Sequence, residues 1–329
     1  MAVPPPSFPR KRAPRASASS LAPGAPLGGH DDHGEELIKL PWPIDLGLTV
    51  ASHGWVHLEP WRWEGEGGTL LHAERIGGRL GRVAVRQRDP RTLAVAWNGF
   101  PDDAAAEIRR RASRWVSAEW DPVPAIAALG PSFADEARLI DCGGGRLLRG
   151  STFYEDFVKT VLTVNTSWSG TCRMSAALVA EPGGGAFPTP DAVLDYGDER
   201  LRKRAKLGFR APTIIAATRR MLDEGAIDRD GHGSSDRLDH DYLQSFKGIG
   251  PYAAAHCRML LHDFSRIPVD SVVVAHLRER HDTNPADFIA ARAECGAYLG
   301  LGYRLLRLRE KFAAPEIDLG PLSPAATAY

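Results

Sequence analysis

Hydrophobic and polar positions follow different patterns in the two parts of the chain. Between residues 37 and 98, apolar residues form short, alternating or β-branched runs separated by Gly, Pro and Asp, which is typical of β-strands. The clearest runs are 46–50 (LGLTV), 69–73 (TLLHA), 82–86 (RVAVR) and 93–97 (LAVAW). From about residue 131 onward, apolar residues recur every three or four positions, which indicates amphipathic helices. The sequence therefore predicts an α+β protein, in which a small antiparallel β-rich domain precedes a mostly α-helical domain.

The composition near both ends of the chain limits these domains. Residues 1–35 are rich in Pro, Ala, Ser and Gly and carry too little apolar surface to form a core. We expect a disordered tail there, a β-rich domain over 36–130 that closes with a helix from Asp102 to Glu119, and a helical domain over 131–312. Residues 313–329 are again rich in Pro and Ala and predict a loose tail. Trp55, Trp61 and Trp63 could line a ligand site, but packing in the core is their expected role.

Charge and cysteine content exclude several classes of protein. The 329 residues include 41 Lys and Arg against 41 Asp and Glu, so the formal net charge is zero and a surface for nucleic acid would have to be a local patch. No apolar run approaches the roughly 20 residues that cross a bilayer, so we expect no membrane contact. The four cysteines are widely scattered, which argues against a zinc ribbon and suits a reducing cytosol. They are Cys142, Cys172, Cys257 and Cys295.

A glycine hairpin between two predicted helices is the most informative motif. It reads Phe246-Lys247-Gly248-Ile249-Gly250-Pro251-Tyr252. Glycines allow a turn with positive φ and a close approach of a large ligand, and Pro251 suits the first turn of a helix. The free N–H groups at that helix start would point out of the hairpin toward an anion such as a backbone phosphate. Lys247 adds a full positive charge beside them.

A single carboxylate follows the hairpin at the start of the next apolar run. After the helix of 252–261, the chain reads Ile267-Pro268-Val269-Asp270-Ser271. Aspartate is a common helix N-cap, so a purely structural role for Asp270 is the alternative. In combination with the hairpin, however, this segment resembles the helix-hairpin-helix/GPD superfamily of DNA glycosylases. The resemblance implies that Lys247, Gly248, Ile249 and Gly250 bind the DNA backbone and that Asp270 is the catalytic carboxylate.

The order of the predicted domains is similar to that of the 3-methyladenine DNA glycosylase II type within this superfamily. The motifs that carry the resemblance lie between Gly150 and Arg309, and the layout of 37–121 agrees with it. The family implies a monomer in base excision repair that acts on double-stranded DNA containing a damaged base. It also implies a location in the cytoplasm at the nucleoid, or in the nucleus of a eukaryote.

Two further segments match the family pattern. The apolar helix of 153–162 ends in Thr163-Val164-Asn165-Thr166. In the family, an amide side chain at this place fills the gap left by a flipped base, and Asn165 occupies the position, although a helix-ending cap is the alternative. The basic run of 200–210 ends in Leu207-Gly208-Phe209-Arg210, which resembles the family's Leu-Gly-Tyr-Arg turn, so we expect a structural role with phosphate contacts nearby.

The residue after the hairpin predicts the type of reaction. Superfamily members that also cut the DNA strand carry a lysine two residues after the second hairpin glycine, and this chain has Tyr252 there. We therefore expect a monofunctional enzyme that leaves an abasic site and has no lyase activity. An aromatic ring at this position can stack on an electron-poor base, which favours alkylated purines as substrates. His256 lies one helical turn later and could line the same pocket, with core packing as the alternative for both residues.

The resemblance also bears on cofactors and on competing functions. Nothing after Cys295 could complete the iron–sulfur cluster that many members carry, so we expect no such cluster and no metal. A monovalent cation at the hairpin carbonyls, as in relatives, is compatible with the sequence. The same fold could act on oxidised or deaminated bases, or the chain could be a non-catalytic helix-hairpin-helix DNA-binding protein. Asp270 argues against the last of these, because phosphate binding has no use for a carboxylate.

Overall fold

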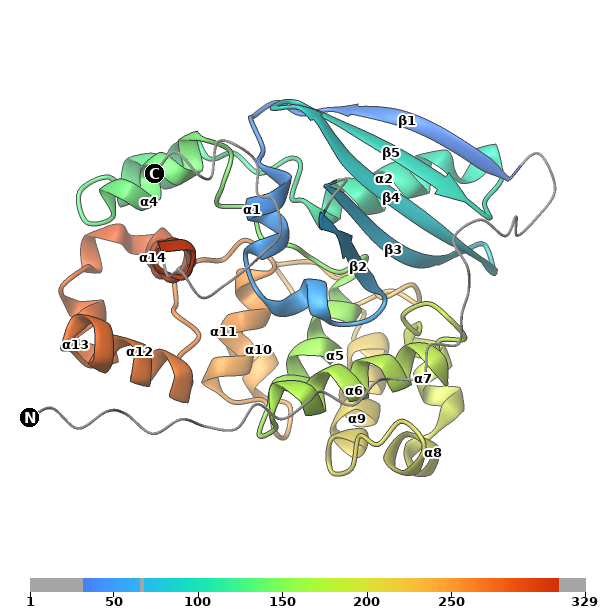
Figure 1. Ribbon diagram of the computed structural model, residues 1–329. Coiled ribbons are helices and arrows are strands. Elements are labelled where there is room, and N and C mark those ends of the chain that lie inside the picture. Colours follow the sequence, from blue (N-terminus) through green and yellow to red (C-terminus); the bar gives the residue numbers. More distant parts are fainter. Residues whose placement is uncertain (1–31, 66–67, 314–329) are drawn as a thin grey trace, which may run out of the picture.

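The computed structural model describes residues 32–65 and 68–313, and within them one antiparallel sheet precedes a helical body (Figure 1). The described strands pair in the order β1-β5-β4-β3-β2. The strands are β1 (His33–Lys39), β2 (Trp61–Glu64), β3 (Thr69–Ile76), β4 (Arg79–Asp89) and β5 (Thr92–Asn98). This layout confirms the predicted α+β class.

Helices make up most of the described chain after the sheet. The first four in chain order are α1 (Leu46–Ala51), which lies between β1 and β2, α2 (Ala105–Trp115), α3 (Val123–Leu129) and α4 (Ala134–Asp141). The middle of the chain forms α5 (Phe153–Thr163), α6 (Trp168–Ala180), α7 (Pro190–Tyr196), α8 (Asp198–Lys203) and α9 (Arg210–Asp223). The remaining helices are α10 (His240–Gln244), α11 (Pro251–Met259), α12 (Ser271–His281), α13 (Pro285–Ala290) and α14 (Leu299–Ala313). None of the described helices is both long and apolar enough to cross a membrane.

The segment 46–50, predicted as a strand, is instead helix α1. Asp45 caps this helix, because its Oδ1 accepts a hydrogen bond from the Leu48 amide at 2.9 Å. The Leu46 amide donates to Gln87 Oε1 at 2.8 Å, so strand β4 helps to fix the first turn. A cap and a long-range partner thus outweigh the strand preference of a five-residue run.

Two strands lie outside the runs predicted from the sequence. Strand β1 begins at His33, inside the segment 1–35 that was predicted as a tail, and it pairs with β5 along its whole length. Strand β2 begins at Trp61 and pairs with β3. The other predicted strands fall within β3, β4 and β5. The predicted tail over 1–31 and the tail over 314–329 lie outside the described residues.

The buried apolar side chains of the described residues form two cores. The first core joins the sheet and α1–α4 to the C-terminal helices, since residues 38–148 and 259–308 contribute to it. The second core consists of side chains from residues 153–257. The middle of the chain therefore forms one body, and segments from both sides of it in the sequence form the other. This division differs from the two consecutive domains predicted with a boundary at residue 130.

A buried polar network joins α5 to the sheet. The Glu155 carboxylate accepts hydrogen bonds from Lys159 Nζ at 2.6 Å and from the Ser151 amide at 2.9 Å. His72 of β3 lies between Glu155 and Glu74, at 3.2 and 2.8 Å from their oxygens. Burial alone lowers the pKa of His72, but the two carboxylates outweigh it and raise that pKa. The network fixes α5, and with it the second core, against strand β3 of the sheet.

Candidate active site

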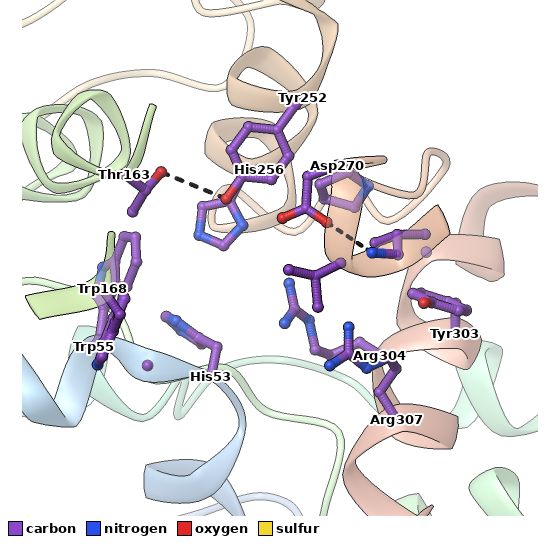
Figure 2. Close-up of a pocket in the computed structure, with 15 residues that line it drawn as sticks. His53, Trp55, Thr163, Trp168, Tyr252, His256, Asp270, Tyr303, Arg304 and Arg307 are labelled. Atoms are coloured by element: carbon purple, nitrogen blue, oxygen red, sulfur yellow. Dashed lines mark hydrogen bonds between the residues drawn. The ribbon is translucent and has the colours of Figure 1, made fainter. Parts of the chain in front are cut away.

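A pocket of about 170 Å³ lies where the two cores meet. Side chains from five separate segments line it, as Figure 2 shows (Figure 2). The principal ones are His53, Trp55, Thr163, Trp168, Tyr252, His256, Asp270, Tyr303, Arg304 and Arg307. The pocket thus brings together three residues that the sequence singled out, namely Asp270, Tyr252 and His256.

Asp270 is the N-cap of α12 and also opens into the pocket. Its Oδ1 accepts a hydrogen bond from the Val273 amide at 2.8 Å, which is the structural role considered from the sequence. Its Oδ2 accepts no hydrogen bond from the described part of the chain, and the residue is half-buried. Figure 2 shows the carboxylate pointing toward the space between Tyr252 and Arg304 (Figure 2). One oxygen therefore fixes the group, and the other is available to a bound molecule.

Tyr252 and His256 form one wall of the pocket from consecutive turns of α11. Their rings stack with centroids 6.1 Å apart and an angle of 21° between the planes. The Tyr252 hydroxyl lies 3.5 Å from Thr163 Oγ1, and burial, together with the nearby Asp270, raises the pKa of the phenol. His256 is only 5% exposed, and neither ring nitrogen has a hydrogen-bond partner in the described chain. Burial and the charge of Arg304 lower the pKa of His256 to about 3, so its ring is neutral.

The segment between α1 and β2 supplies a second aromatic wall. The Trp55 ring lies 5.0 Å from that of His256, and its Nε1 donates to Asp156 at 2.9 Å in the second core. His53 Nε2 donates to the Leu148 carbonyl at 2.6 Å, which leaves Nδ1 as an acceptor without a partner. Burial lowers the pKa of His53 well below its usual value, and His256 lowers it further. Trp55 thus packs in the core, as expected, and lines the pocket as well.

Helix α14 contributes the positive charge of the site. Arg304 and Arg307 line the pocket, and neither forms an ion pair with a described residue. A larger hollow of about 760 Å³ adjoins the pocket and is lined by His53, Trp168 and both arginines, together with Lys311. None of the described residues that line this hollow is acidic. Arg304, Arg307 and Lys311 therefore form a local positive patch beside the pocket, although the net charge of the whole chain is zero.

The glycine hairpin leads directly into the helix that carries Tyr252. Gly248 has φ +87°, whereas Gly250 has φ −90°, so only the first glycine adopts the positive φ expected of both. A Cβ built on Gly250 would meet no atom within 4 Å, and α11 has no side-chain cap at this residue. Lys247 is exposed, whereas Ile249 as a whole is only 5% exposed, and its amide donates to the Phe246 carbonyl at 3.1 Å. The hairpin residues themselves do not line the pocket.

Asn165 lies in the exposed link between α5 and α6. It adopts a left-handed conformation with φ 49° and follows Thr163, which lines the pocket. The Arg210 guanidinium donates to the Asn165 carbonyl at 3.1 Å and also to that of Val164. Arg210 is only 6% exposed, so it anchors this turn rather than facing solvent.

Several pocket residues were not identified from the sequence. Arg304, Arg307 and Lys311 recur at i, i+3 and i+7, and this spacing of positive charges on one helix face was the available signal. His53 and Trp168 had no such signal, because each enters the pocket from a loop or helix start whose position depends on the packing of both cores. The Trp168 ring lies so close to Gly54 that a Cβ there would approach it to 2.4 Å.

No family model matches the sequence, and no curated protein matches it. Solved structures do resemble it in fold. The 3-methyladenine DNA-glycosylase from Archaeoglobus fulgidus superimposes with a TM-score of 0.63 at 20% identity, over 83% of this chain and 98% of its own. MBOgg1 in complex with a low-affinity DNA ligand gives a TM-score of 0.60 at 19% identity, over 84% of this chain and 96% of its own. The chain therefore has the fold of these two structures over most of its length.

Proposed function

We propose that this chain is a DNA glycosylase that hydrolyses the N-glycosidic bond of a damaged base and leaves an abasic site. One observation carries the proposal: the free oxygen of Asp270 opens into the same pocket as the stacked rings of Tyr252 and His256. The fold of the two similar structures supports it. A flat pocket wall beside a carboxylate suits a planar base with its sugar at the pocket mouth.

Asp270 would act on the sugar. Loss of the base gives the anomeric carbon oxocarbenium character, and a carboxylate nearby stabilises that charge. The same group can accept a proton from the water whose oxygen bonds to the anomeric carbon as the bond to the base nitrogen breaks. The helix start at Asp270 fixes the group through the Val273 amide, so little reorganisation is needed during the reaction.

The exposed positive groups would hold the duplex while the base leaves the stack. Lys247 and the uncapped amides at the start of α11 face solvent together, which suits one backbone phosphate. The hollow beside Arg307 and Lys311 extends the positive surface toward the pocket. Such contacts grip DNA without reading its sequence, and flipping costs a few kcal/mol, least for a damaged base. Asn165, at the exposed end of α5, is our candidate for the residue that enters the vacated space.

An alkylated purine is the substrate class that we favour. An N-alkylated purine carries a positive charge and leaves as a neutral molecule, so its excision requires no general acid. His256 is neutral at neutral pH, because its pKa is lowered to about 3, and the raised pKa of Tyr252 makes its phenol a weak acid. The stacked ring of Tyr252 would also attract an electron-poor base.

Arg304 gives support to a second class, the neutral oxidised or deaminated purines. Its guanidinium lines the pocket and has no carboxylate partner in the described chain, so it would repel a cationic base and donate to a carbonyl oxygen.

The variant Arg304→Gln tests which class of base the pocket prefers. We expect it to raise the excision rate of an alkylated purine relative to that of a deaminated purine by roughly tenfold, which corresponds to about 1.4 kcal/mol. Single-turnover rates on matched duplexes measure this ratio, with Arg307→Gln as the control. An equal fall for both lesions would show that Arg304 serves the DNA backbone instead.

The proposed reaction is tested with duplexes that each bear one lesion. We expect strand breaks only after alkali treatment, because hydrolysis leaves an intact abasic site and Tyr252 cannot form a Schiff base. Breaks before alkali, or a complex trapped by borohydride, would contradict the monofunctional mechanism. Tight binding without product from any lesion would favour a non-catalytic DNA-binding protein.

A further inference from the structure

Two histidines and a glutamate converge on one point between α12 and α14, outside the candidate active site. His276 and His281 lie on α12, and Glu310 lies on α14. One ligand atom from each residue lies within 4.8 Å of the other two. His276 Nε2 is 2.7 Å from Glu310 Oε2, and His281 Nε2 is 3.0 Å from Glu310 Oε1. The proposed hydrolysis uses none of these three side chains.

The donor set is that of a zinc-type metal site. Two imidazoles and one carboxylate are a common protein ligand set for Zn²⁺, which leaves a fourth position for water. Tetrahedral ligands at roughly 2.0 Å from zinc are about 3.3 Å apart, so small rotamer changes would open the observed spacings to the required ones. All three side chains are half-buried, with exposures between 13% and 28%, so the site is reachable from solvent.

The surroundings of the histidines are also compatible with metal binding. His276 Nδ1 lies 3.0 Å from the Tyr303 hydroxyl, an outer partner of the kind that orients a metal-bound imidazole. Its Nε2 lies 2.7 Å from Glu310 Oε2 and donates its proton to that carboxylate, a proton that a bound ion would displace. His281 Nε2 is buried and faces Glu310, yet it makes no hydrogen bond of acceptable geometry in the described chain. Glu310 thus satisfies His276 Nε2 but leaves His281 Nε2 without a hydrogen bond, at a place where both nitrogens and the carboxylate meet.

We propose that His276, His281 and Glu310 bind one divalent transition-metal ion of the zinc class. The ion would link α12, which Asp270 caps, to α14, which carries Tyr303 and Arg304. It would therefore fasten together two elements that form one side of the pocket. The metal has no place in the hydrolysis itself, so this inference does not depend on the proposed function. It departs from the sequence prediction of no metal.

The proposal is tested with the full chain after treatment with a chelator. Titration with Co²⁺ should give visible absorption bands that saturate at one ion per chain. Excess Zn²⁺ should raise the melting temperature by roughly 5 °C, as expected for a ligand at about 100 times its dissociation constant. Glu310→Gln and His281→Gln should abolish both effects, since each removes a ligand with little change in volume.

A control tests whether the metal binds instead to a second histidine- and aspartate-containing segment of the sequence. His30-Asp31-Asp32-His33 could chelate metal by itself, so the double variant His30→Gln/His33→Gln should keep the Co²⁺ bands unchanged. Circular dichroism and melting without metal establish that each variant is folded, and His276→Gln supplies a third test if one is not. The proposal is overturned if the wild-type chain binds no stoichiometric Co²⁺. It is also overturned if binding persists in the folded α12 or α14 variants or disappears in the double variant.

Discussion

Replacing Asp270 by Asn should lower the rate of base excision by about 10²- to 10⁴-fold while the protein keeps its fold and its affinity for DNA. The amide has nearly the shape of the carboxylate but neither its charge nor its ability to accept the proton of the attacking water. Asparagine is also a good N-cap, so the bond to the Val273 amide can persist. Single-turnover excision at saturating enzyme measures the chemical step apart from binding.

Asp270→Ala provides the matched control for the structural role of this residue. Alanine removes both the charge and the cap, which typically costs about 1 kcal/mol of stability. We therefore expect both variants to lose excision to a similar degree, but only the alanine variant to melt earlier. Full activity in the asparagine variant would remove Asp270 from the mechanism. Loss of DNA binding in that variant would instead show that Asp270 contributes to binding of the substrate.

Replacing Lys159 by Met should destabilise the protein by about 3–5 kcal/mol. The ammonium group is fully buried and lies 2.6 Å from Glu155 Oε1, and the carboxylate is buried with it. Removal of the lysine leaves Glu155 with His72 and one amide, at a place where water cannot replace the lost donor. Chemical denaturation of the two proteins measures the difference in the free energy of unfolding.

The surface of the same chain offers a control with the same spacing. Lys203 lies 2.7 Å from Glu199 in an i, i+4 pair, but both side chains are more than 70% exposed. Lys203→Met should therefore change stability by no more than about 0.5 kcal/mol. The double variant Glu155→Gln/Lys159→Met should be more stable than Lys159→Met alone, since no buried charge is then left without its partner. Equal losses of unfolding free energy for Lys159→Met and Lys203→Met would show that the buried ion pair contributes no more to stability than the exposed one.

Local signals in the sequence predicted the class of fold and most of its elements. The runs 69–73, 82–86 and 93–97 fall inside strands, and the helix starting at Ser271 begins where its cap predicts. Helix α1 was misjudged because its cap by Asp45 and its contact with Gln87 are not visible as a periodic pattern. The division into two cores was also beyond reach, since it depends on contacts between segments more than a hundred residues apart.

The candidate site was accessible from the sequence only where a motif fixed it. Asp270 and Tyr252 stand at set distances from the glycine hairpin, and the structure places them in one pocket. Arg304 and Trp168 have no motif, and they line the pocket because α14 and α6 pack on opposite cores. The charge and the shape of the pocket therefore depend on tertiary packing.

The discontinuous first core has a consequence for biosynthesis. The first core needs side chains from α14, so it cannot be completed until the ribosome has translated that helix. The second core uses only residues 153–257 and can therefore form earlier. Contacts of such long sequence separation form slowly, because loop closure precedes any gain from them. We therefore expect the middle body to fold first during translation and the pocket between the two cores to form last, so that a newly made chain lacks a complete site until α14 has packed.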